Sequence, residues 1–302
     1  ELDCYTTENL NAHYQFKVPN YKKRSWLRGI GQEVPNLGYL TPDPLVDEYR
    51  EYRWIGTGNQ TFKQTHGVVD LWIPLIFWFN DIRRALPSYK IPQQQSVIEL
   101  DLANIDDIVG VADYGGGGGF NAPRVKKCEL YLSQIFLLPE MLDLVRNFTE
   151  FTLIRVHRNH EQILKSNSGS VRLTSLKWPV ERMYIGLRPT ANNILSQYWF
   201  KNSVLTETEI QVPVSVAGSV ALNNIIYQAE ASVVQTMGFR FHGNPYLENF
   251  PVEFYNTYTP YHFGHKTVAP EDPGWYLVSF ANEPDDKNPS GHFNTSRSRE
   301  IY

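Results

Sequence analysis

The stretch Val68-Val69-Asp70-Leu71-Trp72-Ile73-Pro74-Leu75-Ile76-Phe77-Trp78-Phe79 is apolar at both odd and even positions. A strand that is covered on both faces has this pattern, because its side chains alternate between two buried surfaces. Asp70 and Pro74 interrupt the run, which is too short to cross a bilayer. Pro74 cannot donate a hydrogen bond within a sheet, so it indicates an edge or a bulge. We therefore predict a β-strand here.

Further strands are predicted on the C-terminal side of this run. Residues 98–102 alternate between apolar and acidic side chains, as a half-buried strand does. Other apolar runs, separated by Pro, Gly and Asn clusters, cover residues 127–138, 151–157, 183–187, 210–220, 233–242, 275–281 and 292–302. Their number predicts a mainly β protein with two units, divided near residues 146–150.

One short helix is predicted at the junction between these two units. Pro139 can occupy a first helical turn and Glu140 follows it, where an acidic side chain is favoured. Met141, Leu142 and Val145 can share one face of a helix. We predict a helix over residues 139–145.

Residues 1–65 show no regular period. They contain Pro19, Pro35, Pro42 and Pro44, together with scattered aromatic residues. We predict long loops that aromatic contacts hold in place, since a flexible linker would be richer in Gly and Ser. The chain begins at a Glu and ends directly after a strand-like run, so we expect it to be part of a longer protein.

Composition excludes several classes of function. The 302 residues are 42% hydrophobic and 14% aromatic, and the formal net charge is −4, which argues against a general binder of nucleic acid or anionic membranes. The one basic cluster, at residues 22–24, is expected to be a solvated loop. The two cysteines, Cys4 and Cys128, lie far apart and indicate a reducing compartment such as the cytosol. No run is long and apolar enough for a membrane span.

Two groups of histidines deserve comparison with metal sites. His157 and His160 lie three residues apart in an expected strand, where residues three apart face opposite sides. His262 and His265 precede Glu271 and Asp272 in a Tyr- and Pro-rich loop, in which histidines that pack within the loop are the usual case. We predict no metal site at either group.

Three further motifs fail tests for catalysis or phosphate binding. The glycine run 115–119 is followed by Phe120 and not by the Lys-Ser/Thr pair of a phosphate-binding loop, so we expect a mobile loop tip. Ser290 lies in Pro-Ser-Gly and not in the Gly-x-Ser-x-Gly motif of a nucleophile elbow. The acids Asp285 and Asp286 are expected to be solvated. We therefore predict no catalytic, no cofactor-binding and no metal-binding residues, and no enzymatic activity.

Several stretches resemble the major capsid proteins of large icosahedral double-stranded DNA viruses, in particular those of the asfarvirus and faustovirus branch. The similarity is collinear from residue 66 to 302, and residues 1–65 show none. The resembling stretches are Trp72–Asn80 with Ala85–Ser88 and Ile91–Pro92, Phe151–His157, Leu176–Glu181 with Met183–Leu187, Tyr258–His262, Pro270–Gly274, and Pro289–Arg297 with its Pro-Ser-Gly and Asn-x-Ser-Arg motifs.

The resemblance implies antiparallel jelly-roll β-sandwiches, arranged as a double jelly roll that is incomplete at both ends. The implied domains are a loop-rich segment at 1–65, the C-terminal part of a first jelly roll at 66–148, and a second jelly roll at 149–302 without its last strand. The family's chains in this branch are about twice as long as this one.

The resemblance also implies a structural function in the virion. Three copies would form a pseudo-hexagonal capsomer that contacts neighbouring capsomers and minor capsid proteins, without cofactors and without direct contact to nucleic acid. Assembly would take place in the host cytoplasm. The glycine-run loop and the loop at 189–208 would make contacts or be exposed.

Two other interpretations remain open at the level of sequence. A carbohydrate-binding, lectin-like β-sandwich would also be rich in aromatic residues, because exposed Trp and Tyr stack on sugars. A cupin-type metalloenzyme would require two or three His and a carboxylate that converge inside one barrel, which the spacing of the His residues does not favour.

Overall fold

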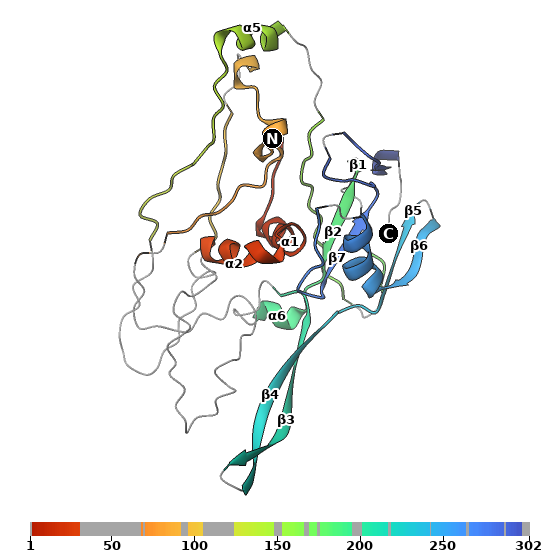
Figure 1. Ribbon diagram of the computed structural model, residues 1–302. Helices are drawn as coiled ribbons and strands as arrows, with labels where there is room; N and C mark the ends of the chain where they lie inside the picture. The colour runs from red at the N-terminus through yellow and green to blue at the C-terminus, as the bar shows by residue number, and fades with distance from the viewer. Residues whose placement is uncertain are drawn as a thin grey trace. The chain divides into compact units, whose positions relative to one another are not determined.

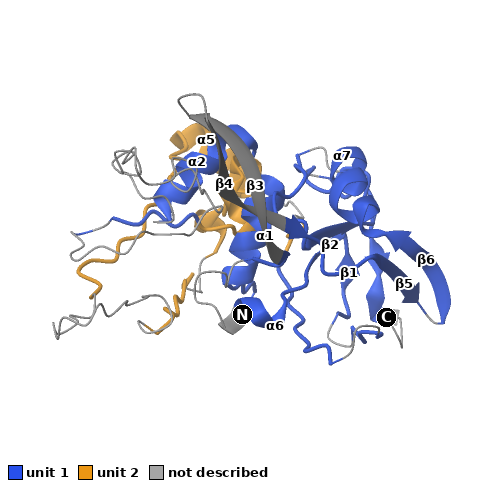
Figure 2. Cartoon of the chain, turned by 90° about the horizontal axis from the view of Figure 1, so that it is seen from below, with its two compact units in different colours: residues 1–74, 157–302 blue, residues 75–156 orange. Residues whose placement is uncertain are grey.

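The computed structural model describes residues 2–30, 68, 70–91, 96–104, 124–147, 153–165, 169–173, 176–194, 201–216, 219–241, 243–263, 266–286 and 288–297. The chain divides into two compact units (Figure 2): unit 1 comprises Glu1–Pro74 with His157–Tyr302, and unit 2 comprises Leu75–Val156. The predicted domain boundary between residues 148 and 149 stays a prediction. No helix in the described part of the chain is long and apolar enough to cross a membrane.

Unit 1 contains antiparallel strand pairs, in agreement with the predicted mainly β character (Figure 1). The pairs are β1 (Pro179–Val180) with β8 (Phe293–Asn294), β2 (Arg182–Gly186) with β7 (Trp275–Ser279), β3 (Val204–Val216) with β4 (Ser219–Ala231), and β5 (Thr236–Phe241) with β6 (Asn244–Pro251). The strands predicted at 183–187, 233–242 and 275–281 are thus confirmed to within three residues at each end.

Strand β7 is buried on both faces, and this position explains its sequence Trp-Tyr-Leu-Val-Ser. Tyr276 and Val278 belong to one cluster of buried residues, whereas Trp275 and Leu277 belong to another. The alternation follows from the two-residue period of a strand. β7 is therefore the strand around which unit 1 packs.

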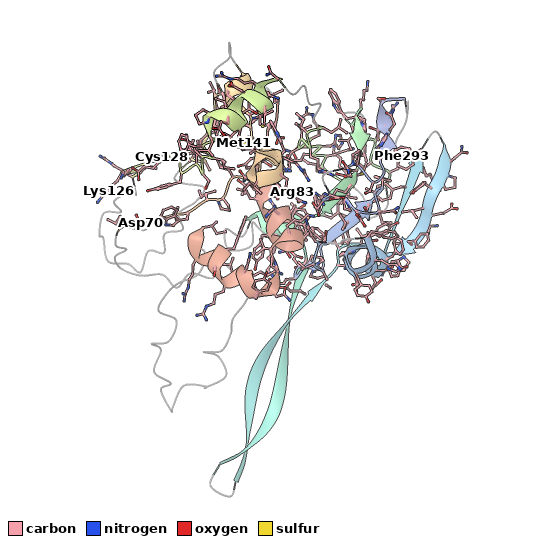
Figure 3. The ribbon with its side chains drawn as sticks, turned by 45° about the horizontal axis from the view of Figure 1, so that its top comes forward. Asp70, Arg83, Lys126, Cys128, Met141 and Phe293 are labelled. Carbon is pink, nitrogen blue, oxygen red and sulfur yellow. The ribbon has the colours of Figure 1, made fainter. Side chains whose placement is uncertain are left out.

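The larger cluster lies between β7, β2 and the β5–β6 pair. Its aromatic members include Phe239, Phe241 and Tyr255. Phe293, which is labelled in Figure 3, adds a ring whose centroid lies 4.0 Å from that of Phe241. Tyr255 is completely buried and its hydroxyl donates to the Met237 carbonyl at 2.9 Å, so its polar atom is satisfied inside the core.

Two helices form where loops were predicted. They are α1 (Thr7–Lys17) and α2 (Asn20–Gly29), and the remainder of the predicted loop segment lies almost wholly outside the described residues. Thr6 and Asn9 form a capping box at the start of α1, and Pro19 precedes α2. The helix α1 buries Ala12 and Phe16 against Trp275 and Leu277. Tertiary packing therefore stabilises a helix that the local sequence does not predict.

Other differences between the predicted and the observed elements lie in the C-terminal half of unit 1. The predicted loop at 189–208 contains the helix α6 (Thr190–Ile194) and the first residues of β3. The predicted strand at 210–220 is part of a hairpin, since it covers the end of β3 and the start of β4. The π-helical segment η5 (Phe254–Tyr258) and the helix α7 (Thr259–Phe263) follow β6, and η6 (Thr295–Arg297) follows β8 within the predicted last strand.

Unit 2 contains the helix α5 (Pro139–Asn147), which confirms the helix predicted at 139–145. The other helical segments among its described residues are the short 3₁₀ turns η2 (Trp78–Asn80), η3 (Ile82–Arg84) and η4 (Ser88–Lys90). Met141 of α5, labelled in Figure 3, is 50% exposed.

Four predicted strands do not form among the residues that the structure describes. The described residues of 68–79, 98–102, 127–138 and 151–157 belong to no strand pair, and Trp78–Asn80 form a 3₁₀ turn instead. Their apolar side chains are exposed or half-buried, with Leu100 and Leu132 each 58% exposed. A strand needs a neighbour to satisfy its backbone groups and to cover its apolar face, and the described chain supplies none to these segments.

Candidate functional site

Two of the histidines singled out in the sequence, His157 and His262, contact other side chains of unit 1. The backbone N–H of His157 donates to Asp3 at 2.6 Å, and its Nδ1 lies 3.1 Å from the same carboxylate. The Asp3 side chain is only 1% exposed, so His157 holds the N-terminal segment in place. His262 contacts the rings of Tyr258, Tyr261 and Phe263, while His265 lies outside the described residues.

No metal-ligand set is present in the part of the chain that the structure describes. Within it, no three His, Cys, Asp or Glu side chains come close enough together to hold an ion. Ser290 closes a turn, because its Oγ accepts a hydrogen bond from the Glu283 N–H at 2.7 Å. The glycine run 115–119 lies outside the described residues. The absence of catalytic, cofactor-binding and metal residues remains a prediction.

Asp285 is not solvated, contrary to the prediction. It forms ion pairs with Lys17 of α1 and with Arg182 of β2, whose Nη2 lies 2.8 Å from Asp285 Oδ1. All three side chains are at most 21% exposed, so the two cations compensate the carboxylate in a poorly solvated place. We call these three residues the Asp285 cluster. The neighbouring Asp286 is exposed.

The Asp285 cluster shifts the pKa of each of its members. Burial acts to raise the pKa of Asp285, but the hydrogen bond and charge of Arg182, together with Lys17, hold it well below its usual value. Burial and the charge of Arg182 lower the pKa of Lys17 to about 8. The cluster therefore ties the end of α1 to β2 by charge as well as by packing.

His13 lies on α1 near the same charges. Its ring stacks on Trp26 of α2, with the ring centroids 5.3 Å apart. Burial, followed by the charges of Lys17 and Arg182, lowers the pKa of His13 to about 4. The imidazole is therefore neutral at physiological pH and joins the two helices as an aromatic side chain.

A second polar cluster surrounds Asp272, which is completely buried. Its Oδ2 accepts from the Asn202 N–H at 2.7 Å, and its Oδ1 accepts from the Gly274 N–H at 2.9 Å. Gln15 of α1 accepts from the N–H groups of Glu271 and Asp272 at 2.9 and 3.2 Å. Burial raises the pKa of the Asp272 carboxyl, although the hydrogen bonds from the Asn202 and Gly274 N–H groups act to lower it.

The turn at Asp272 requires glycine two residues later. A Cβ at Gly274 would lie 2.1 Å from the Asn202 carbonyl oxygen, which is backbone and cannot move aside. The Asp-Pro-Gly sequence therefore places the chain that precedes β3 directly against the turn that precedes β7.

The Asp272 cluster continues into the base of the β3–β4 hairpin. Lys201, just before β3, pairs with Glu230 near the end of β4 at 2.6 Å. Asn192 of α6 donates to the carbonyls of Lys201 and Ser203, at 2.9 Å each. Both strands of the hairpin are thus fixed where they leave the core.

These two clusters are built to hold segments together. Asp272 uses both carboxylate oxygens on backbone donors, and two cations hold Asp285, so neither carboxylate is placed to exchange a proton with a substrate. No sequence motif indicates Gln15, Phe16 and Lys17, which connect α1 to the rest of unit 1. The signal that could have indicated α1 is the capping pair Thr6 and Asn9.

Comparisons with known proteins agree with a structural function. The family model described as "Large eukaryotic DNA virus major capsid protein" matches residues 144–302. Over 313 residues the chain is 29% identical to the hexon protein p72 of one African swine fever virus isolate and to the major capsid protein of another. Each match covers 87% of this chain and 48% of the relative, so the chain spans about half the length of these relatives.

A solved structure is similar over the entire chain. The Faustovirus major capsid protein matches it with a TM-score of 0.73 and 27% sequence identity, covering 100% of this chain and 65% of that protein. The relatives are named as hexon or major capsid proteins and not as enzymes. The family that the sequence motifs indicated is therefore confirmed.

Proposed function

Because the chain belongs to the family of large eukaryotic DNA virus major capsid proteins, we propose that it is a structural part of a viral capsid shell. The observation that carries the proposal is the similarity of the whole chain to the Faustovirus major capsid protein, at a TM-score of 0.73. The two buried polar clusters support it, since their hydrogen bonds and ion pairs connect distant segments of unit 1.

The proposed architecture is a double jelly roll, with parts of a first roll at 66–148 and a second roll at 149–302. The antiparallel pairs around β7 are suited to the second roll. The exposed apolar residues of unit 2 are suited to strands of the first roll whose neighbours come from the additional length that the relatives have. The additional strands would cover these residues.

The proposed assembly is a homotrimer with a pseudo-hexagonal outline. Such capsomers would contact one another and minor capsid proteins in the virion, after assembly in the host cytoplasm, without cofactors and without direct contact to nucleic acid. The name hexon protein of a relative supports this assembly. An obligate trimer requires large contacts, upwards of about 2,000 Å² in total.

Electron microscopy of the complete protein that contains this chain tests the proposal. We expect particles with three lobes and a hexagonal outline, and a mass of three chains in mass photometry. A monomer that shows saturable binding on a glycan array would favour the lectin-like alternative. One tightly bound metal per chain in elemental analysis would favour a cupin-type enzyme, and either result would refute the capsid proposal.

A further inference from the structure

Residues 3–29, which we call the α1–α2 segment, are attached to the rest of unit 1 by pairs of charged and polar side chains (Figure 1). The pairs join Asp3 to His157, Glu8 to Arg188, Tyr14 to Glu271, Lys17 to Asp285 and Lys23 to Glu271. The apolar contact of the segment with β7 is the smaller cluster, to which it contributes Ala12 and Phe16. As far as the structure describes it, the larger cluster has no member from this segment. The segment can therefore leave unit 1 without breaking the larger cluster.

His13 lies within this attachment, in surroundings that oppose a positive charge. Its half-buried ring stacks on Trp26 of α2, with an angle of 22° between the ring planes. The charged and titratable groups that face it are Lys17 of α1, Arg182 of β2, His157 and Asp285. Asp285 is already paired with both Lys17 and Arg182. A proton on His13 would therefore be repelled by these two cations, while they share the attraction of the carboxylate.

Two of the groups that face His13 respond differently to mild acid. Burial acts to raise the pKa of Asp285, but the hydrogen bond and charge of Arg182, together with Lys17, hold it well below its usual value. Asp285 therefore keeps its charge and its ion pairs at pH 5. His157 lies beside the buried carboxylate of Asp3, so a proton on His157 would strengthen that contact. Of these three groups, only His13 weakens the attachment as the pH falls to 5.

We propose that protonation of His13 releases the α1–α2 segment from unit 1 in mild acid, while the strand pairs of unit 1 stay formed. Release brings the imidazole into water, where it can bind the proton that the attached segment excludes. A segment that leaves at one pH and returns at another is a conformational switch, and histidine is the usual residue for this purpose. The release is a property of unit 1 and does not depend on the proposed capsid function.

The size of the effect follows from the two states of His13. In the attached segment, burial and the charges of Lys17, Arg182 and His157 lower its pKa to about 4, against 6.5 for an ordinary histidine. Attachment is therefore strongest above pH 6.5 and weakens as the pH falls toward 4. These pKa values make the equilibrium constant for release about thirtyfold larger at pH 5 than at pH 7.5.

Hydrogen–deuterium exchange of the complete protein, with mass spectrometry of its peptides, tests the release. The measured rates are divided by the intrinsic exchange rates at each pH. We expect the protection of the α1 amides to fall about thirtyfold between pH 7.5 and pH 5. The amides of β5 should change by less than about threefold, because this strand packs in the larger cluster, which stays formed.

His13→Gln is the test variant, and His262→Gln is its matched control. His262 is an exposed histidine of α7, so we expect its variant to keep the wild-type fall in α1 protection. His13→Gln should reduce that fall to less than about threefold. Three results would overturn the proposal: no fall in the wild type, an equal fall in His13→Gln, or an equal fall in α1 and β5.

Thiol labelling covers the case in which His13→Gln fails to fold. Ala12→Cys retains His13 and places a thiol at a position of α1 that is 5% exposed. Dithiodipyridine, which reacts with thiols even in acid, should label it at least about tenfold faster at pH 5 than at pH 7.5, relative to the exposed Cys4. Mass spectrometry of the labelled peptides distinguishes the two thiols. A ratio of labelling rates that is the same at both pH values would overturn the proposal.

Discussion

At the scale of single residues, Gln15 shows how one side chain connects distant parts of the sequence. Its amide oxygen accepts two hydrogen bonds from the backbone of Glu271 and Asp272, more than 250 residues away. In the sequence Asp272 is comparable to a metal ligand, because a carboxylate near two histidines is typical of metal sites. Its backbone partners depend on the tertiary fold, so local sequence could not reveal them.

His13 should make unit 1 sensitive to acid. Its pKa is about 4 in the folded protein, against 6.5 for an ordinary histidine. Below pH 6.5 the unfolded chain takes up a proton that the folded protein cannot accept until the pH reaches about 4, so the free energy of unfolding falls over this range. The full loss in the free energy of unfolding is about 3 kcal/mol. Urea unfolding between pH 7.5 and 4.5 measures it.

His13→Gln is the matched variant for this prediction. We expect it to remove most of the loss of stability between pH 7.5 and 4.5, whatever its effect at neutral pH. The comparison must be between the two proteins, because burial raises the pKa of Asp272 and this carboxyl acts in the opposite direction. Equal slopes in both proteins would show that His13 is not the responsible group.

At the scale of elements, the helices and strands that the sequence predicted are those marked by residues within the element itself. Strand β7 was found from its apolar run, and α5 from Pro139, Glu140 and its apolar face. The helix α1 was missed because three consecutive residues, Tyr14, Gln15 and Phe16, are buried, which is not the spacing of an amphipathic helix. Its neighbours in space come from the far end of the chain and are invisible in the local sequence.

Phe16 should be the main attachment of α1. It is completely buried and packs against the rings of Tyr184 and Trp275, with centroid distances of 5.2 and 6.4 Å. We expect Phe16→Ala to lower the free energy of unfolding by about 3–5 kcal/mol, as truncation of a buried aromatic residue does. Trypsin should then cleave faster after Lys17, since a helix of 11 residues is not stable alone.

Tyr21→Ala is the control for this prediction. Tyr21 is an aromatic residue of the neighbouring helix α2, and it is 80% exposed. Its truncation should change the free energy of unfolding by less than about 0.5 kcal/mol. If both variants behaved alike, α1 would not depend on its contact with β7.

At the scale of the whole molecule, the sequence predicted the family but could not supply the neighbours of every segment. Leu100 and Leu102 alternate with acids as a half-buried strand does, yet they are 58% and 60% exposed. Periodicity indicates which face of a segment is apolar, and it does not indicate which segment covers that face. The relatives are about twice as long as this chain, so the covering segments can come from that additional length.

Phe136 of unit 2 provides a test of this explanation. It is 87% exposed in the structure of this chain, so Phe136→Ala should change the stability of residues 1–302 produced alone by less than about 0.5 kcal/mol. In the complete protein we expect the same substitution to cost about 3–5 kcal/mol, because additional strands would bury the ring. Tyr261 of unit 1 is 85% exposed and serves as the control, since Tyr261→Ala should leave the stability of residues 1–302 unchanged. Urea unfolding of each variant measures its free energy of unfolding. A neutral Phe136→Ala in the complete protein would show that the ring of Phe136 stays in solvent there too.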